Sequence, residues 1–159
     1  MIIKKVRKNL VYWIIIMLTF VLDQLTKAKA ENVFLDSSVN LLGGILSLTY
    51  VQNRGGAFSI LEGKRIFFII VSIILILFLC YMIFKSTSNL YRLSFSLIVG
   101  GAMGNLFDRV AKGYVVDFID IKVIPVFNLA DFFITCGVLL LIFLMLKEGG
   151  EELFLKKKS

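Results

Sequence analysis

The run IFFIIVSIILILFLCYMIF, residues 66–84, constrains this chain more than any other feature because it carries no charged side chain. About 20 consecutive apolar residues cross the hydrocarbon core of a bilayer as a helix. Three further apolar segments, 11–28, 93–109 and 128–147, have suitable length for the same role. The sequence therefore predicts one integral membrane domain, residues 1–159, that is all-α with a small β part and has four transmembrane helices.

The segments between the spans differ in charge and pattern. Lys and Arg are denser near the termini and the 85–92 turn, so we expect residues 1–10, 85–92 and 148–159 to be cytoplasmic. Residues 29–65 and 110–127 are then extracytoplasmic. LSLTYVQ (46–52) alternates with period two and predicts a small extracytoplasmic β-sheet, whereas the apolar 110–127 segment is typical of an interfacial loop.

The two ends of the chain are a possible signal peptide at the start and a polar tail at the end. A basic start, an apolar run and Ala28-Lys29-Ala30 resemble a cleavable signal peptide, but Asp23 and Lys27 place charges where a cleavage site prefers small neutral residues. We therefore favour a first transmembrane helix over 11–28. The tail after Lys147 is predicted to be solvated and disordered.

Composition excludes several kinds of chemistry. The chain has a net charge of +7, but its basic residues cluster beside apolar segments, so no nucleic-acid partner is expected. It has no His, which excludes a Ser-His-Asp triad and any His-ligated metal site. Cys80 and Cys136 lie deep in apolar runs and are expected to be packing residues. If the chain is an enzyme, carboxylates must carry its chemistry, and we expect no metal or cofactor.

Residues 100–131 hold four of the eleven acidic residues, beside long apolar runs. Acids beside hydrocarbon are costly and are therefore functional candidates. Asp117 and Asp131 should lie at one membrane depth, where two close carboxylates would share a proton and could hydrolyse a peptide. The sequence alone shows neither this pairing nor which acid would be the base.

Purely structural interpretations also exist for these residues. Asp23 and Lys27 are spaced i, i+4 as a helix-end ion pair. Asp108 and Arg109 could pair at another helix end, and Asn128 with Asp131 resembles a capping box. The segment 53–58 (NRGGAF) could be a plain turn, and Ser96, Gly100 and Gly104 predict close helix packing.

Five sequence blocks carry a family resemblance. They are LDQLTK (22–27), NRGGAFS (53–59), GNLFDRV (104–110), VVDF (115–118) and FNLAD (127–131), in this order. Each is weak alone, but together they resemble the signature blocks of lipoprotein signal peptidase, or signal peptidase II. Two departures are Gly56, where the block more often has Ala, and the short interval from Asp117 to Asp131.

The resemblance implies a membrane-embedded aspartyl peptidase of the bacterial cytoplasmic membrane, with its active site at the outer face. Its substrate would be a diacylglyceryl-modified prolipoprotein, cut just before the lipidated Cys, with membrane lipid around it and no obligate protein partner. Asp117 and Asp131 match the catalytic dyad, and Asp120 is expected to lie outside the chemistry. The matching substrate-binding or supporting residues are Asp23, Lys27, Asn53, Gly55, Asn105, Asp108, Arg109, Asn128 and Ala130.

Rival functions would use the same acids differently. A small four-span transporter could relay protons or bind a cation through them, although transport acids more often lie at mid-membrane on broken helices. A structural membrane subunit would use the acids only as helix caps. A metal-dependent peptidase with carboxylate ligands is also chemically possible.

Overall fold

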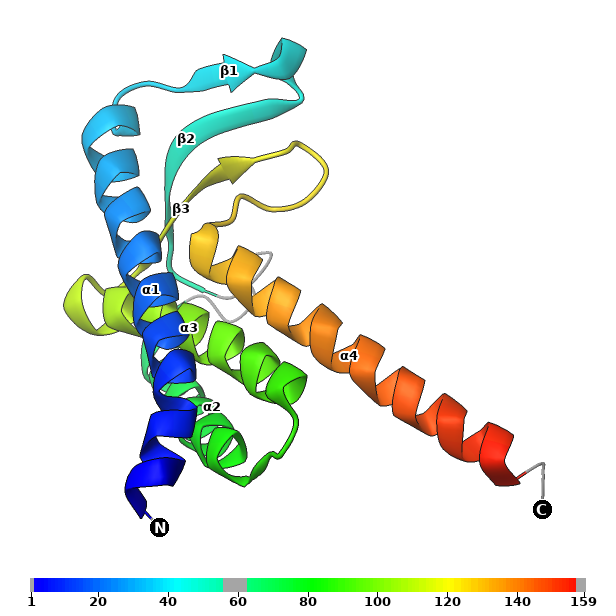
Figure 1. The fold of residues 1–159 in the computed structure, drawn as a ribbon. Helices are drawn as coiled ribbons and strands as arrows, with labels where there is room; N and C mark the ends of the chain where they lie inside the picture. Colours follow the sequence, from blue (N-terminus) through cyan, green and yellow to red (C-terminus); the bar gives the residue numbers. More distant parts are fainter. Residues whose placement is uncertain (1, 56–62, 157–159) are drawn as a thin grey trace.

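The computed structural model describes residues 2–55 and 63–156, and the side chains of residues 9–55 and 63–148 (Figure 1). Within these ranges the chain is mostly helical with a small sheet, as the sequence predicts. The elements in order are α1 (Ile2–Phe34), β1 (Val39–Leu41), the short 3-10 helix η1 (Leu42–Gly44), β2 (Leu46–Asn53), α2 (Arg65–Lys85), α3 (Asn89–Ala111), β3 (Val115–Asp120) and α4 (Leu129–Lys156).

Helix α3 packs against each of the other three helices, as Figure 1 shows. Its glycines make this possible. A Cβ at Gly104 would lie 2.2 Å from Asp23 Oδ2 on α1, and one at Gly101 would lie 2.5 Å from the Ala130 carbonyl oxygen on α4. A Cβ at Gly100 would likewise overlap the Thr19 side chain. The close helix packing predicted from the small-residue stripe is confirmed as the α1–α3 contact.

Among the described helices, three are long and apolar enough to cross a membrane: Asn9–Phe34, Arg65–Lys85 and Leu129–Glu148. Their apolar side chains are largely exposed; only 11% of the most apolar window of α2 is buried within the protein. An apolar surface of this extent indicates contact with lipid. Helix α3 is not among these three, and its buried residues include Arg, Ser, Gly, Asn and Asp besides apolar side chains.

The sheet is antiparallel with the order β1-β2-β3. Residues 46–52 form a strand as predicted. The register of β2 with β3 pairs Val51 with Asp117 and Asn53 with Val115, with an irregularity between Leu48 and Val51. The interfacial loop predicted over 110–127 is therefore wrong for Val115–Asp120. This strand was missed because Val115 to Phe118 are all buried and show no period-two alternation.

The ends of the helices also differ from the sequence prediction. Helix α1 extends beyond 11–28 at both ends, and α3 begins at Asn89, which shortens the 85–92 turn. The disordered tail predicted after Lys147 is wrong as far as Lys156, because α4 continues to that residue. The segment EELFLK supplies residues of good helix propensity there. Of the predicted turn at 53–58, residues 56–58 lie outside the described ranges.

Candidate active site

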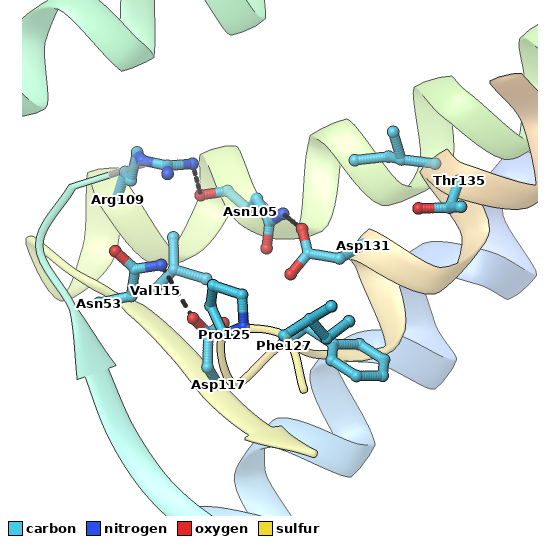
Figure 2. A pocket seen from close by; sticks show the side chains of 11 residues that line it. Asn53, Asn105, Arg109, Val115, Asp117, Pro125, Phe127, Asp131 and Thr135 are labelled. Carbon is cyan, nitrogen blue, oxygen red and sulfur yellow. Dashed lines mark hydrogen bonds between the residues drawn. The ribbon is translucent and has the colours of Figure 1, made fainter. Parts of the chain in front are cut away.

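A pocket of about 390 Å³ lies where the sheet meets the ends of α3 and α4 (Figure 2). Strands β2 and β3, helix α3, the β3–α4 turn and the first turns of α4 each contribute to its wall. Its lining residues are Asn53, Asn105, Arg109, Val115, Asp117, Ile124, Pro125, Phe127, Asp131, Ile134 and Thr135. The two acids that the sequence singles out therefore line one cavity, although they lie on a strand and on a helix.

Asp117 is held on β3 by two side-chain amides. Asn53 Nδ2 donates to Asp117 Oδ2 over 2.9 Å, and Asn128 Nδ2 donates to Oδ1 over 2.7 Å. The residue is only 2% exposed. Burial raises the pKa of Asp117 to about 7; the hydrogen bond from Asn53 opposes this rise and the charge of Asp131 adds to it. Asp117 can therefore change protonation state near neutral pH.

Asp131 lies in the first turn of α4, where it closes a capping box. Asp131 N donates to Asn128 Oδ1 over 2.9 Å, and Asn128 N donates back to Asp131 Oδ2 over 3.3 Å. The capping box predicted from the sequence is confirmed. The same carboxylate accepts a 2.8 Å hydrogen bond from Asn105 Nδ2 and lines the pocket. The capping contact and the contact with Asn105 thus use different oxygens of Asp131.

A buried cluster of charges lies beside the pocket wall. Lys27 Nζ is 2.8 Å from Asp23 Oδ2 and 3.0 Å from Asp108 Oδ2, and these three side chains are at most 1% exposed. Asp23 Oδ1 accepts the Ala130 N–H over 2.8 Å, and Asp108 Oδ2 accepts the Val116 N–H over 3.1 Å. The predicted Asp23–Lys27 pair is confirmed, but it is buried. The predicted Asp108–Arg109 pair is wrong, since Asp108 faces Lys27.

Arg109 points toward the pocket and holds the end of β2. Its Nη2 donates to the Gly55 carbonyl oxygen over 3.0 Å, and its guanidinium carbon lies 4.9 Å from the centre of the Phe68 ring. Asn53 Oδ1 in turn accepts the Gly55 N–H over 3.0 Å. Asn53, Gly55 and Arg109 thus form one connected edge of the pocket.

Comparison with known proteins identifies the family. A family model described as "Signal peptidase (SPase) II" matches residues 15–147. The chain belongs to the signal peptidase II family. A lipoprotein signal peptidase of Caldicellulosiruptor bescii is 89% identical, over 94% of this chain and 99% of that protein. One from Halothermothrix orenii is 43% identical, over 82% and 91%.

A solved structure is also similar. It is a bacterial membrane enzyme that superposes with a TM-score of 0.83 at 35% identity, covering 89% of this chain and 90% of that one. The apolar helices and this membrane-enzyme neighbour together indicate a multi-pass membrane protein, and family membership makes the chain a peptidase.

In the structure, the predicted site residues of this peptidase line the pocket, contact its lining residues or lie buried behind its wall. Asn53, Asn105, Arg109, Asp117 and Asp131 line the pocket. Asn128 hydrogen-bonds to both acids, and Gly55 contacts Arg109. The remaining predicted residues, Asp23, Lys27, Asp108 and Ala130, lie behind the pocket wall as its buried support. Asp120 is absent from the lining, and its carboxylate pairs with Lys122 over 2.6 Å.

Sequence reasoning missed several residues in and around this pocket. Ile134 and Thr135 line the pocket, and a signal for them exists, since they follow Asp131 at i+3 and i+4 on one helix face. Arg65 was not singled out. Its Nε donates to the Arg109 carbonyl oxygen over 2.6 Å and its Nη2 to that of Val110 over 3.0 Å. This contact satisfies carbonyls at the end of α3 and holds the start of α2 against the site.

Proposed function

We propose that this peptidase uses Asp117 and Asp131 as an aspartic dyad to remove signal peptides from diacylglyceryl-modified prolipoproteins, just before the lipidated Cys. One observation carries the proposal: both carboxylates line a single cavity, and each accepts a hydrogen bond from an Asn side chain. Family membership supports the substrate class, because relatives at up to 89% identity are lipoprotein signal peptidases.

The two acids have different environments, which supports different roles. With its pKa at about 7, Asp117 is largely protonated below neutral pH and can donate to the scissile carbonyl oxygen. Asp131 lies in the first turn of α4 and accepts hydrogen bonds from Asn105 Nδ2 and Asn128 N. In the proposed reaction Asp131 takes a proton from the attacking water while Asp117 protonates the carbonyl oxygen. Asp131 then gives its proton to the leaving nitrogen while Asp117 takes one back from a hydroxyl of the tetrahedral intermediate. The C–N bond breaks, which releases the amine and the carboxylic acid.

Four transmembrane helices fit this arrangement. Helix α3 contacts α1, α2 and α4, so its polar residues are covered by apolar helices and need not face lipid. It leads from the turn at 86–88 to the pocket at its other end. In Figure 1 the first turns of α1 and the last turns of α4 both lie far from the sheet. We therefore place both termini in the cytoplasm and the sheet with the pocket at the outer face of the cell membrane.

The pocket then lies at the depth where a lipidated substrate and water can meet. The acyl chains and the apolar signal helix of the substrate would remain in the bilayer beside the enzyme. Arg109 and Asn105 line the cavity with donors that can orient the peptide or the lipid headgroup. The reaction as proposed needs no metal, cofactor or protein partner. A transporter function is not favoured, because the family is a peptidase family.

The test uses purified protein in detergent and two substrates, a diacylglyceryl-modified prolipoprotein and the same precursor without the lipid. Gel mobility would follow cleavage, and mass spectrometry would identify the new N-terminus. We expect cleavage of the lipidated substrate alone, with the modified Cys as the new first residue, and none by folded Asp117→Asn. Failure of the wild type on a verified lipidated substrate would remove the substrate assignment. Full activity of Asp117→Asn would remove the dyad assignment.

A further inference from the structure

Lys27 is a buried cation whose three N–H donors all have partners. Its Nζ lies 2.8 Å from Asp23 Oδ2, 3.0 Å from Asp108 Oδ2 and 2.9 Å from Asn105 Oδ1. An ammonium group has no acceptor. Any side chain that contacts it must therefore present an oxygen.

This requirement fixes the orientation of the Asn105 amide. Its oxygen faces Lys27, so its Nδ2 faces the pocket and donates to Asp131 Oδ1 over 2.8 Å. A rotated amide would place its NH2 group against the ammonium and its oxygen against the carboxylate. Both contacts would then be repulsive, in a site where burial makes them costly.

The orientation of a second amide, that of Asn128, is fixed in the same way. Asn128 Nδ2 donates to Asn105 Oδ1 over 3.1 Å and to Asp117 Oδ1 over 2.7 Å. The Asn128 oxygen accepts the N–H of Asp131 over 2.9 Å. Each amide in this chain can adopt only the orientation that supplies an N–H donor to an acid of the dyad.

We infer that Lys27 is a positioning residue for catalysis, acting through Asn105 and Asn128 so that each acid of the dyad faces an amide N–H. This inference rests on the dyad proposed above. Lys27 itself does not line the cavity and touches neither acid of the dyad at hydrogen-bond distance. Its effect should therefore appear in kcat more than in KM.

The experiment is a double-mutant cycle on cleavage of a diacylglyceryl-modified prolipoprotein. Removing Lys27 alone would leave Asp23 and Asp108 buried without a cation, so the cycle is built in an Asp23→Asn background. Asp23→Asn alone makes this cluster neutral, and adding Lys27→Met returns its net charge to the wild-type value of −1. Lys27→Met and Asn105→Ala are made singly and together in this background, and thermal unfolding checks that each protein is folded.

With Asn105 present, we expect Lys27→Met to lower kcat by about 10- to 100-fold, the range for loss of a charge-assisted hydrogen bond, while KM changes less than about threefold. With Asn105→Ala, the same substitution should lower kcat by less than about threefold, because the group it acts through is absent. Equal losses in the two backgrounds, or no loss in the first, would overturn the inference.

A second variant leaves Lys27 in place. Asn105→Asp still offers an oxygen to the ammonium but has no N–H for Asp131, so kcat should fall by about 10- to 100-fold. An unchanged kcat would also overturn the inference. Wild type and Asp117→Asn are assayed alongside. If the wild type cleaves and Asp117→Asn does not, while Lys27→Met causes equal losses with and without Asn105, only the role of Lys27 is wrong. An inactive wild type would instead count against the proposed function.

Discussion

The protonation of Asp117 makes a prediction about stability that does not depend on any substrate. Its folded pKa of about 7 lies above the unfolded value of 3.8, so the folded protein binds a proton more tightly than the unfolded chain. Stability from this group is fully present below the unfolded pKa and falls as pH rises toward 7. At 1.36 kcal/mol per pKa unit, the difference between the folded and unfolded pKa values of Asp117 contributes about 4 kcal/mol to the free energy of unfolding at low pH.

The substitution Asp117→Asn removes this titration. Between pH 5 and pH 8, linkage from these two pKa values gives a loss of about 2–3 kcal/mol in the wild type that the variant does not show. The new amide would also oppose one N–H donor, from Asn53 or Asn128, which costs about 1–3 kcal/mol at every pH. As pH rises, the free energy of unfolding of the variant should therefore increase relative to that of the wild type. This trend does not depend on the constant difference in stability between the two proteins.

The assay is denaturant-driven unfolding of both proteins in the same detergent at several pH values. Asp120→Asn is the matched control on the same strand, because Asp120 is paired with Lys122 outside the pocket. The expected result is a difference in unfolding free energy that changes by about 2–3 kcal/mol in favour of Asp117→Asn between pH 5 and pH 8. A difference that stays constant over this range would show that Asp117 is ionised throughout, and would refute the reasoning.

Further predictions concern the rate and the helix packing. Cleavage activity should fall about tenfold between pH 6 and pH 8 as Asp117 loses its proton. Asn53→Ala should move this decline to higher pH, because the hydrogen bond from Asn53 lowers the pKa of Asp117. A decline that does not move would show that Asn53 does not determine this pKa. Gly104→Ala should lower stability by about 1–3 kcal/mol in detergent unfolding, because its Cβ would meet Asp23 Oδ2 at 2.2 Å; wild-type stability would mean that α1 can move away. Incubation with EDTA should leave cleavage unchanged, and lost activity restored by a divalent metal would favour a metal-dependent mechanism.

Local patterns predicted the helical part of the fold well. The charge-free run at 66–84 is a helix because its length and composition allow little else, and α2 matches it within a residue at each end. The small residues 100 and 104 predicted a close helix contact that the structure assigns to α1 and α3. The capping box of Asn128 and Asp131 was also readable, since its spacing is set within one helical turn.

What the sequence could not give are contacts that depend on the tertiary arrangement. Strand β3 exists because β2 supplies hydrogen-bond partners, and its buried residues show no alternation that would predict it. A pair of Asp108 with its neighbour Arg109 was one interpretation of the sequence, yet Asp108 faces Lys27 on another helix. The wall formed by Val115, Pro125 and Phe127 likewise arises only when the β3–α4 turn brings Phe127 back to pair with Ile119.

The central claim is that Asp117 and Asp131 together perform the hydrolysis. The most direct measurement is the single-turnover cleavage rate of a diacylglyceryl-modified prolipoprotein by wild type, Asp117→Asn, Asp131→Asn and Asp120→Asn, each confirmed to be folded. The account predicts that each dyad variant loses at least about 100-fold in rate, since a positioned acid or base contributes about 100- to 10,000-fold. Asp120→Asn should retain the wild-type rate. Normal cleavage by folded Asp117→Asn or Asp131→Asn would contradict the account and make Asp108 the next acid to test.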